Sequence, residues 1–188
     1  AIADVKYPVS FLFALAEGLL KEAKRLARET RTSTLCHLWL RAPVVSEQAK
    51  ALLNSLYKRE EHKPEGRILT GRPYTVKQAE RLTELARALS ALPAAQRRSL
   101  AEAVEKGVHV SLNYALYQAA RQKDRGAQFW EVFDEMGKLL GSAQDGFWFW
   151  RRTAEGWKTA LLDALELIEL GAVLDTPREE HHAPSAAH

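Results

Sequence analysis

The residues whose types could most readily do chemistry form an aromatic and arginine-rich stretch in the C-terminal part of the chain. They read Phe147-Trp148-Phe149-Trp150-Arg151-Arg152, and Trp157 follows shortly after. Aromatic rings interleaved with arginines can stack on exposed bases and hold phosphates, as in grooves for single-stranded nucleic acid. Large aromatic side chains also anchor small helical cores, and this is the interpretation that we favour. The stretch therefore predicts core packing, with base stacking as the alternative.

A second candidate is a row of basic side chains on an expected helix. Lys21, Lys24 and Arg28 are spaced so that they can share one flank of a helix. Together they would attract an anion, and the Lys24 ammonium would offer a compact point charge to a phosphate. A charged helix flank is more often only a solvated surface. Both interpretations stay open on the residues alone.

The sequence motifs of self-sufficient enzymes are missing. The chain contains no Gly-Gly pair, no glycine-rich phosphate loop, no Gly-x-Ser-x-Gly and no His-Glu-x-x-His. His181 and His182 stand beside Glu179 and Glu180, but we expect a mobile tail there, which cannot hold metal ligands in fixed geometry. We therefore assign no catalytic residue and no metal ligand.

The single cysteine and the composition limit the class of protein. A lone Cys36 excludes an internal disulfide and fits a reducing cytoplasm, and the neighbouring His37 is expected to be a core or edge histidine with its hydrogen bonds satisfied. With 188 residues, 46% of them hydrophobic, the chain can bury one core of ordinary size. A net charge of +3 does not demand a nucleic-acid partner. No stretch is apolar enough to span a membrane, so we expect a soluble cytoplasmic protein.

The elements that must position these residues divide the chain near residue 45. Residues 1–42 predict strand, helix, strand, with the helix opening at Pro8 and Ser10 and the second strand over Thr34–Leu40. From residue 46 to 174 nearly every signal is helical, which predicts a compact helical bundle, and 175–188 is expected to be a mobile tail. The expected helices span 47–59 capped by Ser46, the segment after the capping box of Thr75 and Gln78, the segment from Pro93 to Gly107, 108–123, 129–140 and 159–170.

The first residues predict a strand without a partner before it. The stretch from Ala1 to Tyr7 reads as the end of a buried strand that runs into the turn at Pro8. An apolar strand edge needs another strand to satisfy its backbone groups. We therefore expect this chain to be the C-terminal part of a larger protein.

Three sequence blocks, in this order and spacing, resemble the C-terminal part of the large subunit of type III CRISPR effector complexes. The resemblance covers most of the chain, beginning at the end of the second palm domain of that subunit. The blocks are Ile2–Ser10 followed by Leu19–Lys24, then Arg72–Thr75 followed by Leu82 and Ala86–Leu89, and finally Phe149-Trp150 followed by Thr159–Leu167.

The resemblance implies a mostly α fold, with a C-terminal helical bundle preceded by the last helix and strand of an α+β palm domain of the GGDEF-like, ferredoxin-like kind. It implies that the whole subunit is a nucleotidyltransferase that makes cyclic oligoadenylates from ATP with Mg or Mn once guide RNA and target RNA pair. Many members also cut single-stranded DNA through an N-terminal domain. The helical domain is expected to pack beside the small helical subunits of the complex.

The resemblance also implies a role for one flank of the first helix. In GGDEF-type cyclases the last palm helix carries an Ala-Lys pair whose lysine contacts nucleotide phosphate, and Ala23-Lys24 matches it. The Gly-Arg-Asn that commonly follows is replaced by Arg28-Glu29-Thr30-Arg31, so the correspondence stops at Lys24. Lys21 and Arg28 are the supporting candidates for nucleotide binding.

The segment by itself is expected to be inactive. The Gly-Gly-Asp-Asp metal turn of the family and its His-Asp nuclease motif are both missing from the chain. Phosphoryl-type transfer needs metal ions held by positioned carboxylates, so no cofactor is expected to be held by this segment alone. The alternative is a free-standing helical adaptor or RNA-binding module with no catalytic activity.

Overall fold

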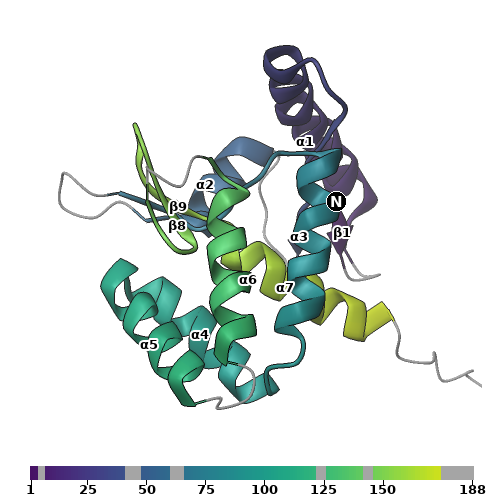
Figure 1. Ribbon diagram of the computed structural model, residues 1–188. Coiled ribbons are helices and arrows are strands. Elements are labelled where there is room, and N and C mark those ends of the chain that lie inside the picture. Colours follow the sequence, from purple (N-terminus) through teal and green to yellow (C-terminus); the bar gives the residue numbers. More distant parts are fainter. Residues whose placement is uncertain (4–6, 41–47, 60–65, 122–125, 142–145, 175–188) are drawn as a thin grey trace, which may run out of the picture.

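The computed structural model describes residues 1–3, 7–40, 48–59, 66–121, 126–141 and 146–174. Most of these residues are helical, which confirms the mostly α class (Figure 1). The helices are α1 (Val9–Thr30), α2 (Ala49–Tyr57), α3 (Val76–Leu89), α4 (Ala94–Lys106), α5 (Val108–Arg121), α6 (Gly126–Lys138) and α7 (Leu161–Leu174). The strands are β1 (Ile2–Ala3), β2 (Thr34–Leu35), β3 (Trp39–Leu40), β4 (Lys58–Arg59), β5 (Arg67–Ile68), β6 (Tyr74–Thr75), β7 (Gly146–Phe147), β8 (Trp150–Thr153) and β9 (Gly156–Thr159).

Helices α3 to α7 pack together, with α3 against α6 and α7, and α4 against α5 and α7 (Figure 1). Local signals explain where these helices begin and end. The Thr75 hydroxyl accepts from the Gln78 backbone N–H at 3.2 Å, and the Gln78 side chain accepts in turn from the Thr75 N–H, as the capping box predicts. Pro93 precedes α4, and Gly107 follows it with a φ of 142° that suits glycine. The predicted start of α3 and both predicted ends of α4 are confirmed.

The N-terminal strand, helix and strand form one parallel unit. Strand β1 pairs in parallel with β3, with Ile2 opposite Trp39, and α1 connects them. The core face of α1 buries Leu15 and Leu19, each worth about 1.5–3 kcal/mol when fully removed from water. The predicted strand over Thr34–Leu40 is wrong as a single element. Its first part, β2, pairs antiparallel with β6, while its last part pairs with β1, so that two different partners divide it.

A five-stranded sheet interrupts the part of the chain that we predicted to be helical throughout. Its strand order is β4-β5-β9-β8-β7, and all neighbours are antiparallel except β5 and β9. The strands β4 and β5 have two residues each, too few for an alternating pattern to show in the sequence. Gly156 lets β5 and β9 approach, because its φ is 125° and a Cβ there would lie 1.9 Å from the Gly66 carbonyl oxygen.

The aromatic stretch lies on this sheet. Phe149 and Trp150 are completely buried, and the Trp150 indole N–H donates to the Ser111 hydroxyl at 2.9 Å. Trp148 is partly buried against Trp130, with ring centroids 4.0 Å apart. Core packing is thus confirmed for Phe149 and Trp150, although in a hairpin and not in a helix. It is wrong for Phe147, which is 70% exposed.

Some expectations fall outside the described residues. They concern the cap at Ser46, the boundary at residues 42–46, the end of the helix expected over 108–123, and the tail 175–188 with its histidines. Three described helices differ from expectation at their ends. Helix α2 ends at Tyr57, because Lys58 and Arg59 pair in the sheet as β4, α6 begins at Gly126, and α7 runs from Leu161 to Leu174. No helix among the described ranges combines the length and the apolar character that crossing a membrane requires.

Candidate functional site

A buried cluster of charged side chains joins α7 to the loop between β5 and β6. Arg72 of this loop and Asp163 of α7 have no exposed side-chain surface, and Glu166 of α7 is 17% exposed. The Arg72 Nη2 lies 3.2 Å from Asp163 Oδ1 and also pairs with Glu166 Oε2. We call this group, together with its hydrogen-bond partners, the arginine cluster; its members are Tyr57, Thr70, Gly71, Arg72, Tyr74, Asp163 and Glu166.

The sequence of α7 explains why two carboxylates are held inside. Asp163 and Glu166 are three residues apart in an otherwise apolar run, so they project from the same face of the helix. Asp163 lies in the first turn, where the positive end of the helix dipole stabilises a negative charge. The guanidinium of Arg72 supplies the countercharge that buried carboxylates need.

Three further polar groups donate to Asp163. Its Oδ2 accepts from the Thr70 hydroxyl at 2.9 Å, from the Gly71 backbone N–H at 2.7 Å and from the Tyr74 hydroxyl. A carboxylate that accepts several hydrogen bonds in a dry interior is stabilised in its charged form. Asp163 therefore ties the β5–β6 loop to α7 through three donors and one ion pair.

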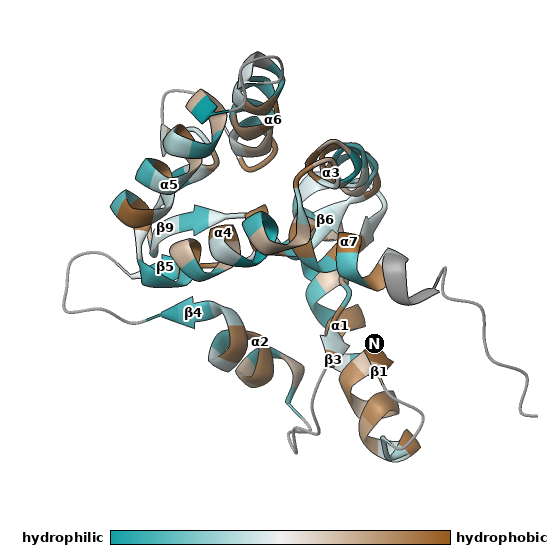
Figure 2. Ribbon diagram, turned by 90° about the horizontal axis from the view of Figure 1, so that it is seen from below, coloured by the Kyte–Doolittle hydropathy of each residue, from teal (hydrophilic) through white to brown (hydrophobic). Residues whose placement is uncertain are grey.

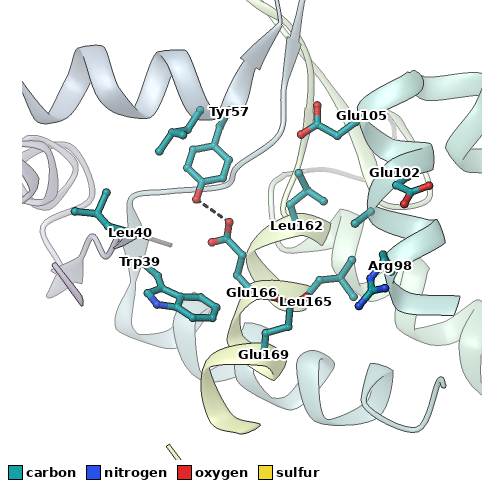
Figure 3. A pocket seen from close by; sticks show the side chains of 12 residues that line it. Trp39, Leu40, Tyr57, Arg98, Glu102, Glu105, Leu162, Leu165, Glu166 and Glu169 are labelled. Carbon is teal, nitrogen blue, oxygen red and sulfur yellow. Dashed lines mark hydrogen bonds between the residues drawn. The ribbon is translucent and has the colours of Figure 1, made fainter. Parts of the chain in front are cut away.

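Tyr57 closes the other side of the cluster. It is the last residue of α2, its hydroxyl donates to Glu166 Oε1 at 2.7 Å, and the Arg72 guanidinium lies over its ring at 4.8 Å. Figure 3 shows the Tyr57–Glu166 hydrogen bond spanning from α2 to α7. Segments more than 100 residues apart in the chain are thus joined at one point.

The electrostatics of the cluster keep its two tyrosines and its arginine in single protonation states. Burial raises the pKa of Tyr74 well above its ordinary value, and the charge of Asp163 raises it further. Burial also raises the pKa of Tyr57, against the opposing effect of Arg72. Burial alone would lower the pKa of Arg72, but Asp163 and Glu166 raise it. Both tyrosines stay donors and Arg72 stays charged at neutral pH, so the arrangement suits a structural clamp better than proton transfer.

Cys36 and His37 lie close enough to the arginine cluster for its charges to shift their pKa values. Burial raises the pKa of the Cys36 thiol to about 11, although the charge of Arg72 lowers it. Burial and then Arg72 lower the pKa of His37 to about 4. Cys36 is therefore a thiol and His37 a neutral imidazole at pH 7, which makes Cys36 a poor nucleophile. The partly buried position agrees with the expected core or edge histidine. The expectation that its hydrogen bonds are satisfied is wrong, because His37 Nε2 is buried and has no hydrogen-bond partner within the described part of the chain.

Two cavities flank Tyr57. The first, which we call the acidic cavity, has a volume of about 470 Å³ and separates Trp39 and Tyr57 from α4 (Figure 3). Leu162, Leu165 and Glu166 of α7 lie between these two walls (Figure 3). Its charged lining residues are Arg98, Glu102, Glu105, Glu166 and Glu169.

The second, which we call the basic cavity, has a volume of about 320 Å³ and shares Tyr57 with the first. It lies against α1, α2 and the strands β5 and β9. Its charged lining residues are Arg25, Lys50, Lys58, Arg72 and Lys158 on the basic side and Glu22 and Glu155 on the acidic side. The two cavities therefore differ in the sign of the charge that they present.

The candidates predicted from the sequence lie elsewhere. Lys21, Lys24 and Arg28 are exposed along one flank of α1, as their spacing predicts, and they do not line either of these two cavities. Their proposed contact with a nucleotide stays a prediction. Sequence reasoning missed Asp163 and Glu166, although two carboxylates inside an apolar helix were a readable signal of buried ion pairs.

Comparison with known proteins does not identify a family for this chain. A scan against protein-family models gives no match, and a search among curated proteins gives none. Within the described ranges no group of three or more His, Cys, Asp or Glu residues is arranged to hold a metal ion. Function must therefore be inferred from the contacts and the sequence blocks described above.

Proposed function

We propose that this chain is the C-terminal portion of the large subunit of a type III CRISPR effector complex, a cytoplasmic machine of RNA-guided antiviral defence. In this proposal β1, α1 and β3 belong to the second palm domain, and α3 to α7 form most of the C-terminal helical domain. The portion supports cyclic oligoadenylate synthesis from ATP by upstream residues, which would hold the Mg or Mn ions. It docks on the small helical subunits and meets guide RNA and target RNA through the complex.

One observation carries the proposal: α1 has a second apolar stripe that faces solvent. Val9 is 80% exposed, Phe13 67% and Leu20 52%, and with Ala16 they follow the i, i+4, i+7, i+11 spacing of one helix face. Brown residues of α1 and β1 gather at the same end of the molecule in Figure 2. Parallel strands rarely occur in pairs alone, because both faces of a parallel sheet need cover. Further palm strands beside β1 and β3 would bury this stripe.

The arginine cluster supports the same proposal. It ties the end of α2 and the β5–β6 loop to α7 through buried hydrogen bonds and a buried ion pair. A rigid support beside a reaction centre needs such fixed contacts and no chemistry of its own. The block Arg72–Thr75, one of the three that carry the resemblance, supplies two of the cluster's side chains.

The exposed apolar stripe of α1 can be tested by comparing the same substitution in this chain and in the longer subunit. In the chain of 188 residues, Phe13→Asp should change the melting temperature little, because the side chain is exposed. In the longer subunit the same change should lower the free energy of unfolding of the palm by about 3 kcal/mol or more, since it would bury a charge where an aromatic ring packs. Thermal melts of both lengths, with and without the substitution, measure the difference.

Ser10→Asp is the matched control, because it adds the same charge at an exposed position on another flank of α1. It should leave both melts nearly unchanged. Equal effects of Phe13→Asp in the two lengths would contradict the proposal. The encoding gene gives a direct check as well: a Gly-Gly-Asp-Asp turn a short distance upstream supports the palm, and a start codon directly before Ala1 favours the free-standing adaptor.

A second test concerns the exposed basic flank of α1. In the intact subunit assembled with guide RNA and target RNA, Lys24→Ala should raise the apparent KM for ATP and reduce oligoadenylate synthesis about tenfold or more, because a charge-assisted contact to phosphate is lost. Assembly, measured by size-exclusion chromatography, should be unchanged. Lys77→Ala on α3, also exposed, is the control. If the Lys24→Ala variant showed wild-type kinetics across an ATP titration, Lys24 would not be part of the ATP site.

A further inference from the structure

The basic cavity has more positive than negative groups in its lining. Five basic side chains and two acidic ones surround it, and they come from α1, α2, β4, the β5–β6 loop, β9 and the β8–β9 turn. Asp163 and Glu166 stand behind Arg72, but both are already engaged by it. The charge of Arg72 is therefore balanced from behind, and the positive charge that faces the cavity comes from the other basic side chains.

Three of the five basic groups are already paired, Arg72 with the two carboxylates behind it and two others with neighbouring glutamates. Arg25 lies 3.2 Å from Glu22 and 3.6 Å from Glu29, and Lys58 lies 3.7 Å from Glu155. Lys50 and Lys158 have no ion-pair or hydrogen-bond partner among the residues that the structure describes. Two ammonium groups thus face the same cavity, and no described residue places a countercharge at contact distance from either.

Lys158 is the more informative of the two. Burial lowers the pKa of its ammonium, and the distant charges of Asp163 and Glu155 offset this only in part. A cation that is largely removed from water and has no contact partner is stabilised by an anion that enters beside it.

Arg72 has unpaired donors behind the same wall. Its Nη2 is engaged by Asp163 and Glu166, but its Nε and Nη1 are buried and lack a hydrogen-bond partner within the described part of the chain. Buried N–H groups of this kind are uncommon, because most find an acceptor. Because the Arg72 side chain has no exposed surface, it adds charge behind the cavity wall and makes no direct contact with the cavity.

We propose that the basic cavity binds a phosphate group, either of a free nucleotide or of a nucleic-acid backbone. Lys158 and Lys50 are its direct ligands, and Arg25 lies at the same wall. Phosphate offers the compact negative charge and the several acceptor oxygens that this wall lacks. About 320 Å³ is enough for a phosphate with its sugar, at the lower end of ligand pockets. This site is separate from Lys21, Lys24 and Arg28, and the inference does not rest on the proposed function.

The test measures binding of inorganic phosphate, ATP and a short single-stranded RNA to the chain by titration calorimetry, with chloride at matched ionic strength as the reference. Lys158→Gln and Lys50→Gln remove one charge each, and Lys77→Gln removes a charge from an exposed position on α3. We expect inorganic phosphate to bind, and each cavity variant to weaken the binding about tenfold or more, as the loss of a charge-assisted hydrogen bond does. Lys77→Gln should bind like the unchanged chain.

The arms of the experiment separate the two sources of phosphate. ATP binding without RNA binding, lost in Lys158→Gln, assigns the site to a nucleotide. RNA binding that falls in Lys158→Gln and shows a linear dependence on log salt concentration assigns it to a nucleic-acid backbone. No binding of phosphate, ATP or RNA, or equal binding by Lys158→Gln and Lys77→Gln, would overturn the proposal. Circular dichroism of each variant shows that the fold is retained.

Discussion

Asp163→Asn is expected to lower the free energy of unfolding by about 3–5 kcal/mol, which is the usual cost of removing one partner from a buried ion pair. The amide would place an NH₂ group where Asp163 Oδ1 now lies 3.2 Å from the Arg72 guanidinium, so that two donors face each other. Arg72 would keep only Glu166 as its countercharge. The loss is large because the side chain of Arg72 has no exposed surface through which water could compensate.

Urea unfolding followed by circular dichroism measures this loss. Asp134→Asn is the matched control: Asp134 also pairs with a cation, 2.7 Å from the Lys138 ammonium, but it is 47% exposed. An exposed pair of this kind is worth about 1 kcal/mol or less. Similar losses in the two variants would show that the arginine cluster does not hold α7 to the β5–β6 loop.

Trp150→Ala is expected to cost about 3–5 kcal/mol as well, because it empties the space of a completely buried indole. The change also leaves the buried Ser111 hydroxyl without the indole N–H that donates to it at 2.9 Å. Thermal melts and urea unfolding should both show the loss. Affinity for single-stranded RNA, measured on the folded protein, should not change.

Phe147→Ala serves as the control for the same stretch, since Phe147 is 70% exposed and its removal should alter stability little. The opposite pattern would overturn core packing. If Trp150→Ala melted like the unchanged chain but bound single-stranded RNA more weakly, by about 1–3 kcal/mol, the stretch would be a stacking platform.

Helices could be predicted from the sequence where capping residues mark their ends. Thr75 and Gln78 fix the start of α3 through contacts within four residues, and Pro93 and Gly107 mark both ends of α4. Such signals need no knowledge of the rest of the fold. The burial of Trp150 was predicted for a similar reason, because a large aromatic ring in a small protein is usually inside.

The sheets could not be predicted from the local sequence in the same way. Strand β5 consists of Arg67 and Ile68, and its partners are Lys58 to Arg59 on one side and Trp157 to Lys158 on the other. Two residues show no alternation, and a partner 90 residues away leaves no mark on the local sequence. The buried position of Arg67, which donates to the Val104 and Glu105 carbonyls at the end of α4, follows from that pairing.

The sequence by itself determined the basic flank of α1, because Lys21, Lys24 and Arg28 share a flank through helix periodicity alone. Only the tertiary structure decided that Arg72, Asp163 and Tyr57 meet, and that Lys50 and Lys158 face one cavity. The physical reason is the range of the forces involved. Helix periodicity acts over one or two turns, whereas a buried ion pair forms wherever packing removes water around two opposite charges, however far apart they lie in the chain.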